Sequence, residues 1–120
     1  MHKHIAEEWC SRLESGKYRQ GRGRLRLEGE TGDEFCCFGV LCEMAVERLI
    51  IPPAANVNGR WQYNESLYSP PEKVKKWANT SLNMEVTYGG RRLTLSKLND
   101  DFGLSFKEIA RVIRRNVKKL

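Results

Sequence analysis

The sequence predicts an α+β fold in which a small antiparallel sheet or hairpins pack against about four helices. Helical and extended hydrophobic patterns follow one another in the order helix, hairpin, helix, loop, helix, hairpin, helix, which is not the regular alternation of a βαβ fold. The chain has 120 residues, so we expect residues 1–120 to form a single globular domain. Apolar residues make up 40% and charged residues 30%, a balance typical of globular proteins.

The first predicted element is a helix over residues 3–15. Five apolar side chains fall on one arc at the helical period: Ile5, Ala6, Trp9, Cys10 and Leu13. Ser15-Gly16 predicts the end of this helix, because glycine readily adopts the left-handed conformation that follows many helices.

A hairpin is predicted next. Residues 22–28 alternate with the period of a strand, which would place three arginines on one face: Arg22, Arg24 and Arg26. Gly29 and Gly32 mark a turn, and residues 34–38 would pair back.

A buried central helix is predicted over residues 40–49, because this segment is apolar around almost its whole circumference. Pro52-Pro53 prevents its continuation. Residues 52–68 then read as an irregular connection that contains one short strand at residues 60–63.

Two capping boxes and a glycine pair organise the rest of the chain. Ser69 and Glu72 predict the start of a helix, with Pro70 at its first position. Gly89-Gly90 joins two alternating runs and predicts a tight hairpin. After one helical turn near residues 95–98, a second box, Ser105 and Glu108, predicts a helix that runs to the C-terminus.

The four cysteines predict buried, reduced thiols. Cys36, Cys37 and Cys42 lack the spacing of a zinc site, and neighbours on a strand point to opposite faces. We therefore expect no metal and no cofactor. The carboxylate pairs Glu43/Glu47 and Asp100/Asp101 have no nucleophile or metal-ligand partner in the pattern, so a catalytic set is not predicted.

The net charge of +6 is concentrated in two segments. The first, residues 17–26, carries five cations and no acid. With the expected helix start after Gly39, Arg22, Arg24 and Arg26 predict a phosphate site. Trp61 and Tyr63 lie in the polar connection and would stack a base. The alternative is a solvated edge strand that resists aggregation.

The second basic segment is the last predicted helix. Its polar face carries five cations: Lys107, Arg111, Arg114, Arg115 and Lys118. Such a face suits nucleic acid, although cations at the end of a helix also complement its dipole. Residues 103–113 resemble the turn and second helix of a helix-turn-helix motif, and Asn99 departs from that motif because a small residue is usual there.

Several segments together resemble a family of small proteins common in bacteriophage and prophage genomes. They include Lys17-Tyr18-x-Gln20-Gly21-x-Gly23, the block Phe35-Cys36-Cys37-Phe38-Gly39-Val40-Leu41-Cys42-Glu43, and Leu98-Asn99-Asp100-x-x-Gly103-x-Ser105. The resemblance implies a compact binding protein in the cytoplasm of a bacterial host, acting against host defence or on host nucleic acid. It carries over no catalytic or binding residue.

Three hypotheses follow. The first is a non-enzymatic protein that binds an anionic nucleotide or a cyclic-nucleotide signal and counters host defence. The second is a DNA-binding regulator that uses the C-terminal basic helix, and the third is an inhibitor that binds a protein of a host defence complex. We expect no membrane partner, because no apolar run reaches the roughly 18 residues of a span. A homo-oligomer is consistent with each hypothesis, since small domains often build a site across an interface.

Overall fold

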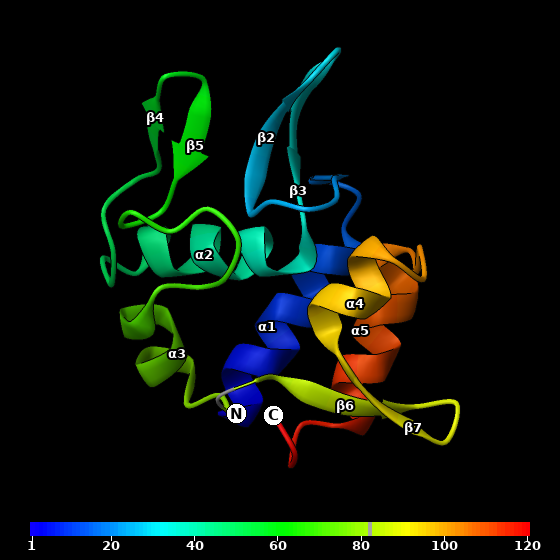
Figure 1. The fold of residues 1–120 in the computed structure, drawn as a ribbon. Coiled ribbons are helices and arrows are strands. Elements are labelled where there is room, and N and C mark those ends of the chain that lie inside the picture. The colour runs from blue at the N-terminus through cyan, green and yellow to red at the C-terminus, as the bar shows by residue number, and fades with distance from the viewer. Residues whose placement is uncertain (82) are drawn as a thin grey trace.

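Helices and short hairpins surround one hydrophobic core in the computed structural model, which describes residues 1–81 and 83–120 (Figure 1). The helices are α1 (Lys3–Glu14), α2 (Cys37–Glu47), α3 (Glu72–Ala78), α4 (Leu95–Asp100) and α5 (Phe106–Arg115). The strands are β1 (Arg19–Gln20), β2 (Arg26–Gly29), β3 (Gly32–Phe35), β4 (Ala55–Val57), β5 (Arg60–Gln62), β6 (Glu85–Tyr88) and β7 (Arg91–Thr94). The predicted α+β class is confirmed.

α1 lies along α5, and the two helices run in opposite directions (Figure 1). The five apolar residues predicted to face inward from α1 are all buried. The Cys10 thiol donates to the carbonyl of Ala110 on α5 at 3.4 Å, and the Trp9 indole donates to the carbonyl of Cys37 on α2 at 2.9 Å. The first, second and last helices therefore form the centre of the core.

α2 begins at Cys37, three residues before the predicted start, and Gly39 lies inside the helix. The prediction that residues 36–38 belong to a strand was wrong. Gly39 is buried where the preceding loop crosses α2, and a Cβ built on it would lie 1.8 Å from the carbonyl oxygen of Leu25. This close approach, and not a helix start, explains the glycine.

Part of the predicted first strand is a bent loop. β2 and β3 pair antiparallel from Arg26↔Phe35 to Gly29↔Gly32, as predicted, and β1 pairs in parallel with β3. Residues 22–25 form bends, with Gly23 at a φ of 84°. The three arginines therefore do not share the face of one strand.

The connection after α2 contains a complete hairpin, of which only β5 was predicted. All three residues of β4 are exposed, and Ala55-Asn56-Val57 is too short a run for its alternation to predict a strand. The β4–β5 and β2–β3 hairpins project from the same side of α2 (Figure 1). The Asn56 amide on the first of these donates to Glu28 on the second at 3.4 Å.

The second half of the chain follows the predicted order with two corrections. α3 starts after Pro71, which is its N-cap, and the Ser69 cap is not formed, because Pro71 holds an extended conformation. The Gly89-Gly90 hairpin is confirmed, with both glycines at positive φ. α5 ends at Arg115, since the side chain of the buried Asn116 turns to the backbone of the β6–β7 hairpin.

None of the described helices combines the length and the hydrophobicity that crossing a membrane requires.

Candidate functional site

Asn99, at the end of α4, is the centre of a buried hydrogen-bond network. Its Oδ1 accepts from Gln20 Nε2 at 2.9 Å and from the backbone N–H of Cys37 at 3.3 Å. Its Nδ2 donates to the carbonyl of Gly21 at 2.9 Å and to Asp100 Oδ1 at 2.8 Å. The amide thus uses both donors and both acceptor positions. One side chain connects the β1 loop, the start of α2 and the end of α4.

The network fixes the loop after β1 against the turn between α4 and α5. Gln20 Nε2 also donates to the carbonyl of Leu104 at 2.8 Å, and Gly23 N–H donates to Asp100 Oδ1 at 3.1 Å. Arg22 Nε donates to the carbonyl of Asn99 at 3.2 Å, and its guanidinium lies beside Gly103. Arg22 is exposed. Arg22 of the first basic segment therefore lies at the turn that leads into the second basic segment.

α5 begins directly after this turn with the predicted capping box. The Ser105 hydroxyl accepts from Glu108 N–H at 3.2 Å, and the Glu108 carboxylate accepts from Ser105 N–H at 3.1 Å. The hydrogen bond from the Ser105 backbone N–H lowers the pKa of Glu108. The carboxylate is therefore ionised and bound at the helix end.

A row of exposed cations follows the outer side of α5 and the turns after it. We call it the α5 stripe: Lys107, Arg111, Arg115 and Lys118. Its first three members are four residues apart and so lie on one face of the helix. Within residues 1–81 and 83–120, none of the four forms an ion pair with a carboxylate. Their charges face solvent.

Arg114, also a predicted site residue, has a different role. Its guanidinium binds the Glu14 carboxylate through two hydrogen bonds of 2.6 and 2.8 Å and lies 3.4 Å from Glu7. The hydrogen bond from Arg114 lowers the pKa of Glu14. Arg114 thus joins α5 to α1, and its charge is already neutralised.

Arg26 and Trp61 bind each other. The Arg26 guanidinium lies 3.9 Å from the centre of the Trp61 ring and donates to Asp33 Oδ2 at 3.0 and 2.5 Å. Both side chains are half-buried between the two neighbouring hairpins. The cation and the aromatic ring predicted to bind a nucleotide are therefore adjacent, but they bind each other, and the ring face covered by Arg26 is not open to a base. Arg24 is also half-buried, in the bent loop.

Tyr63 and Gly39 lie inside the protein. The Tyr63 side chain is fully buried, not an exposed ring as predicted, and its hydroxyl donates to Glu43 at 2.6 Å. Burial and this hydrogen bond raise the pKa of Tyr63. Gly39 N–H donates to the carbonyl of Cys36. Neither residue is exposed at the surface, so of the predicted phosphate and stacking residues Arg26 and Trp61 lie together, and Tyr63 and Gly39 do not join them.

The cysteines are core residues, as predicted. All four are buried and free: Cys10, Cys36, Cys37 and Cys42. Burial raises the pKa of Cys10 to about 12 and that of Cys36 to about 11, so the thiols are neutral and weakly nucleophilic at pH 7. In the part of the chain that the structure describes, no three His, Cys, Asp or Glu side chains form a potential metal site.

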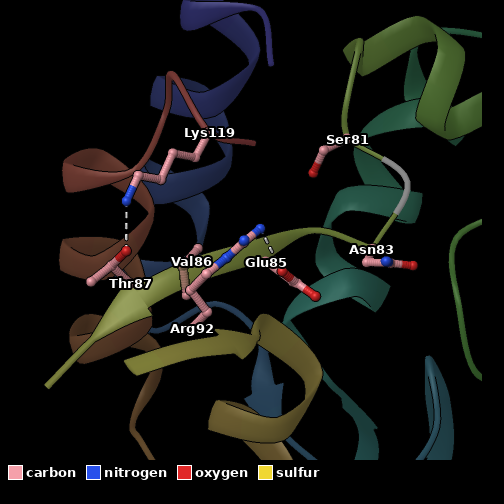
Figure 2. Close-up of a pocket in the computed structure, with 7 residues that line it drawn as sticks. All are labelled: Ser81, Asn83, Glu85, Val86, Thr87, Arg92 and Lys119. Atoms are coloured by element: carbon pink, nitrogen blue, oxygen red, sulfur yellow. Dashed lines mark hydrogen bonds and ion pairs between the residues drawn. The ribbon is translucent and has the colours of Figure 1, made fainter. Parts of the chain in front are cut away.

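A polar pocket of about 480 Å³ lies beside the β6–β7 hairpin (Figure 2). Its two cations have partners within the pocket. Arg92 pairs with Glu85 at 2.9 Å, and Lys119 Nζ donates to the Thr87 hydroxyl at 2.6 Å. These internal contacts make the pocket a weaker candidate for an anion than the α5 stripe.

Sequence reasoning missed Gln20 and Asp100 as partners of Asn99. The departure of Asn99 from the helix-turn-helix pattern was the available signal, because a buried polar residue at a packing position needs partners. Asp100 is the next residue in the sequence, whereas Gln20 lies 79 residues away, beyond the reach of any local pattern.

Residues 1–117 are similar to the model of a family described as Domain of unknown function (DUF8296). No curated protein and no solved structure matches the chain.

Proposed function

The chain belongs to the DUF8296 family, whose description assigns no activity, and from the chemistry of its basic surface we propose that it binds double-stranded nucleic acid. We define the basic surface as Arg22 together with the α5 stripe. The observation that carries the proposal is the Asn99 network, which places Arg22 beside the turn that leads into α5. Two basic segments far apart in the sequence thus contribute to one surface.

The cations of this surface are free to bind phosphates. Three acids near them already have partners within the protein: Glu14 is bound by Arg114, Glu108 by the backbone of Ser105, and Asp100 by Gly23. An arginine or lysine without a carboxylate partner gains more from a phosphate, because its binding releases counterions from the nucleic acid without breaking an ion pair. The proposal therefore rests on contacts to the phosphate backbone.

The arrangement of α4 and α5 supports a duplex as the ligand. The two helices follow one another through a turn in which Gly103 has a φ of 66°, and the α5 stripe extends away from that turn. Helix-turn-helix proteins place the second helix of such a pair in the major groove. α4 has six residues, so the resemblance concerns the turn and the second helix.

Anisotropy titration of a labelled duplex tests the proposal. Five cations on the basic surface predict a slope of log affinity against log salt of about −4.5. Replacing Arg111 and Arg115 by Glu is expected to weaken binding by at least about tenfold and to make the slope shallower by about 2.

The matched control is Lys73→Glu with Lys76→Glu, which makes the same change in net charge on exposed positions of α3. It is expected to change the affinity less than threefold or so, because only long-range attraction is reduced. No binding of the wild-type chain at low salt, or equal losses in both double variants, would overturn the proposal.

Binding of a small nucleotide and a role against host defence stay predictions of the sequence and of the phage resemblance. Titration with mononucleotides and cyclic nucleotides in the same assay separates them from duplex binding. A nucleotide that binds the chain more tightly than the duplex at equal salt would favour the first hypothesis over the one proposed.

A further inference from the structure

A groove of about 800 Å³ lies between the start of α1 and the segment that follows α5. The two chain ends lie close together there (Figure 1). Met1 and Val117 contribute partly buried apolar side chains that pack against the core. The exposed cations Lys3, Arg115 and Lys118 also line the groove.

The charge of the groove selects an anionic ligand. Among the described residues, Lys3, Arg115 and Lys118 form no ion pair. The acid that lines the groove, Glu7, lies 3.4 Å from Arg114, which also binds Glu14, and the described lining carries five cations against this one acid. A ligand with two or more negative groups would therefore meet cations without displacing an internal partner.

The floor of the groove selects an aliphatic group over a nucleobase. The described residues that line it include no aromatic ring, whereas stacking on aromatic side chains is the common way to hold an unpaired base. Methionine adapts to varied aliphatic shapes and is frequent at surfaces that bind peptides. The cations and the aliphatic floor of the groove together fit a peptide segment that has carboxylates on both sides of an apolar side chain.

We propose that this groove binds an acidic segment of a partner protein, in which an aliphatic side chain sits on Met1 and Val117 and flanking carboxylates bind the surrounding cations. The inference goes beyond nucleic-acid binding, because Lys3, Met1 and Val117 do not belong to the basic surface. Arg115 and Lys118 belong to both, so peptide and duplex compete.

Anisotropy with a labelled peptide that has one leucine flanked on both sides by glutamates tests the proposal on the full chain. Two matched peptides replace the leucine by serine or the glutamates by glutamine, and each is expected to bind about tenfold more weakly, because one loses the apolar contact and the other the charges. Equal binding of the leucine and serine peptides would show charge attraction alone and overturn the proposal.

Lys3→Glu separates the groove from the basic surface. Lys3 is exposed at the first position of α1, where a negative side chain interacts favourably with the helix dipole. The variant is therefore expected to fold. It should weaken peptide binding at least fivefold or so and leave duplex affinity within twofold or so. Lys73→Glu on α3 is the control and should leave peptide binding within twofold or so.

The outcomes distinguish the two proposals. Peptide binding that depends on Lys3 without any duplex binding would support the groove and overturn the proposed function alone. If Lys3→Glu and Lys73→Glu weaken peptide binding equally, the groove proposal is overturned. A mononucleotide and the unlabelled peptide can each be tested for displacement of the labelled peptide. If the mononucleotide displaces it at a lower concentration than the unlabelled peptide does, the groove binds nucleotides and the peptide proposal is overturned.

Discussion

At Gly39 the backbone of α2 lies against the carbonyl oxygen of Leu25, and the space for a side chain is absent. We predict that Gly39→Ala destabilises the protein by about 3 kcal/mol or more, because backbone has to move to admit the methyl group. Urea denaturation measures the loss. Gly59→Ala is the comparison: its Cβ would meet nothing within 4 Å, and the positive φ alone costs about 1 kcal/mol. Equal losses in both variants would contradict the packing explanation.

The buried thiols and the buried phenol make the protein less stable as the pH rises into the alkaline range. A cysteine in the unfolded chain titrates near its ordinary value of 9.0, whereas burial raises the pKa of Cys10 to about 12. Between these values the native state binds more protons than the unfolded state, so the free energy of unfolding falls as pH rises. Tyr63, whose pKa is also raised, adds to the fall above its ordinary value of 10.0.

Urea midpoints measured from about pH 8 to about pH 10.5 should therefore decrease steadily. Cys10→Ala is expected to lower stability at pH 8 and to reduce the slope above pH 9, since one titrating thiol is gone. An unchanged slope in this variant would show that Cys10 does not contribute.

At the scale of elements, Asn99 holds three segments together. Asn99→Ala leaves Gln20, the Cys37 N–H and the Gly21 carbonyl without this partner, and we expect a loss of about 2–4 kcal/mol. Amide exchange at Gly23, in the loop that the network holds, should accelerate as well. Lys97→Ala, at an exposed position of the same helix, is the control. A small loss at Asn99 with unchanged exchange at Gly23 would show that the loop is held by other contacts.

The capping box of α5 gives a smaller and separate prediction. Ser105→Ala removes the hydroxyl that accepts from Glu108 N–H and is expected to cost about 1 kcal/mol. Ser105→Thr retains the hydroxyl and should recover most of that loss. Thermal denaturation of the three proteins checks the order. If the alanine and threonine variants melt together, the cap does not stabilise α5.

Local sequence patterns predicted the elements in which apolar or capping residues recur at the spacing of one helix. The inward face of α1 and the box that starts α5 each depend on residues within one helix. The site required contacts between distant segments: Cys37 and Asn99 are 62 residues apart. The same reason explains the misplaced start of α2, because the role of Gly39 is visible only once Leu25 crosses the helix.

At the scale of the molecule, the helical centre and the two projecting hairpins differ in stability. α1, α2 and α5 bury their apolar faces in the core, while every residue of β4 is exposed. We predict that amides in the β4–β5 hairpin exchange at least about 100-fold faster than those of α2, since local opening there exposes little apolar surface. Hydrogen exchange followed by NMR measures both. Equal protection would indicate that the hairpins open only with the core.

The pairing of α1 with α5 also affects how the protein is made. A ribosome adds about 5–20 residues per second, so the apolar face of α1 emerges several seconds before the helix that covers it. During that interval Cys10, whose thiol donates to the carbonyl of Ala110 in the finished fold, has no final partner. We expect the core to close only after α5 has left the ribosome, which makes the nascent chain a client for holding chaperones until then.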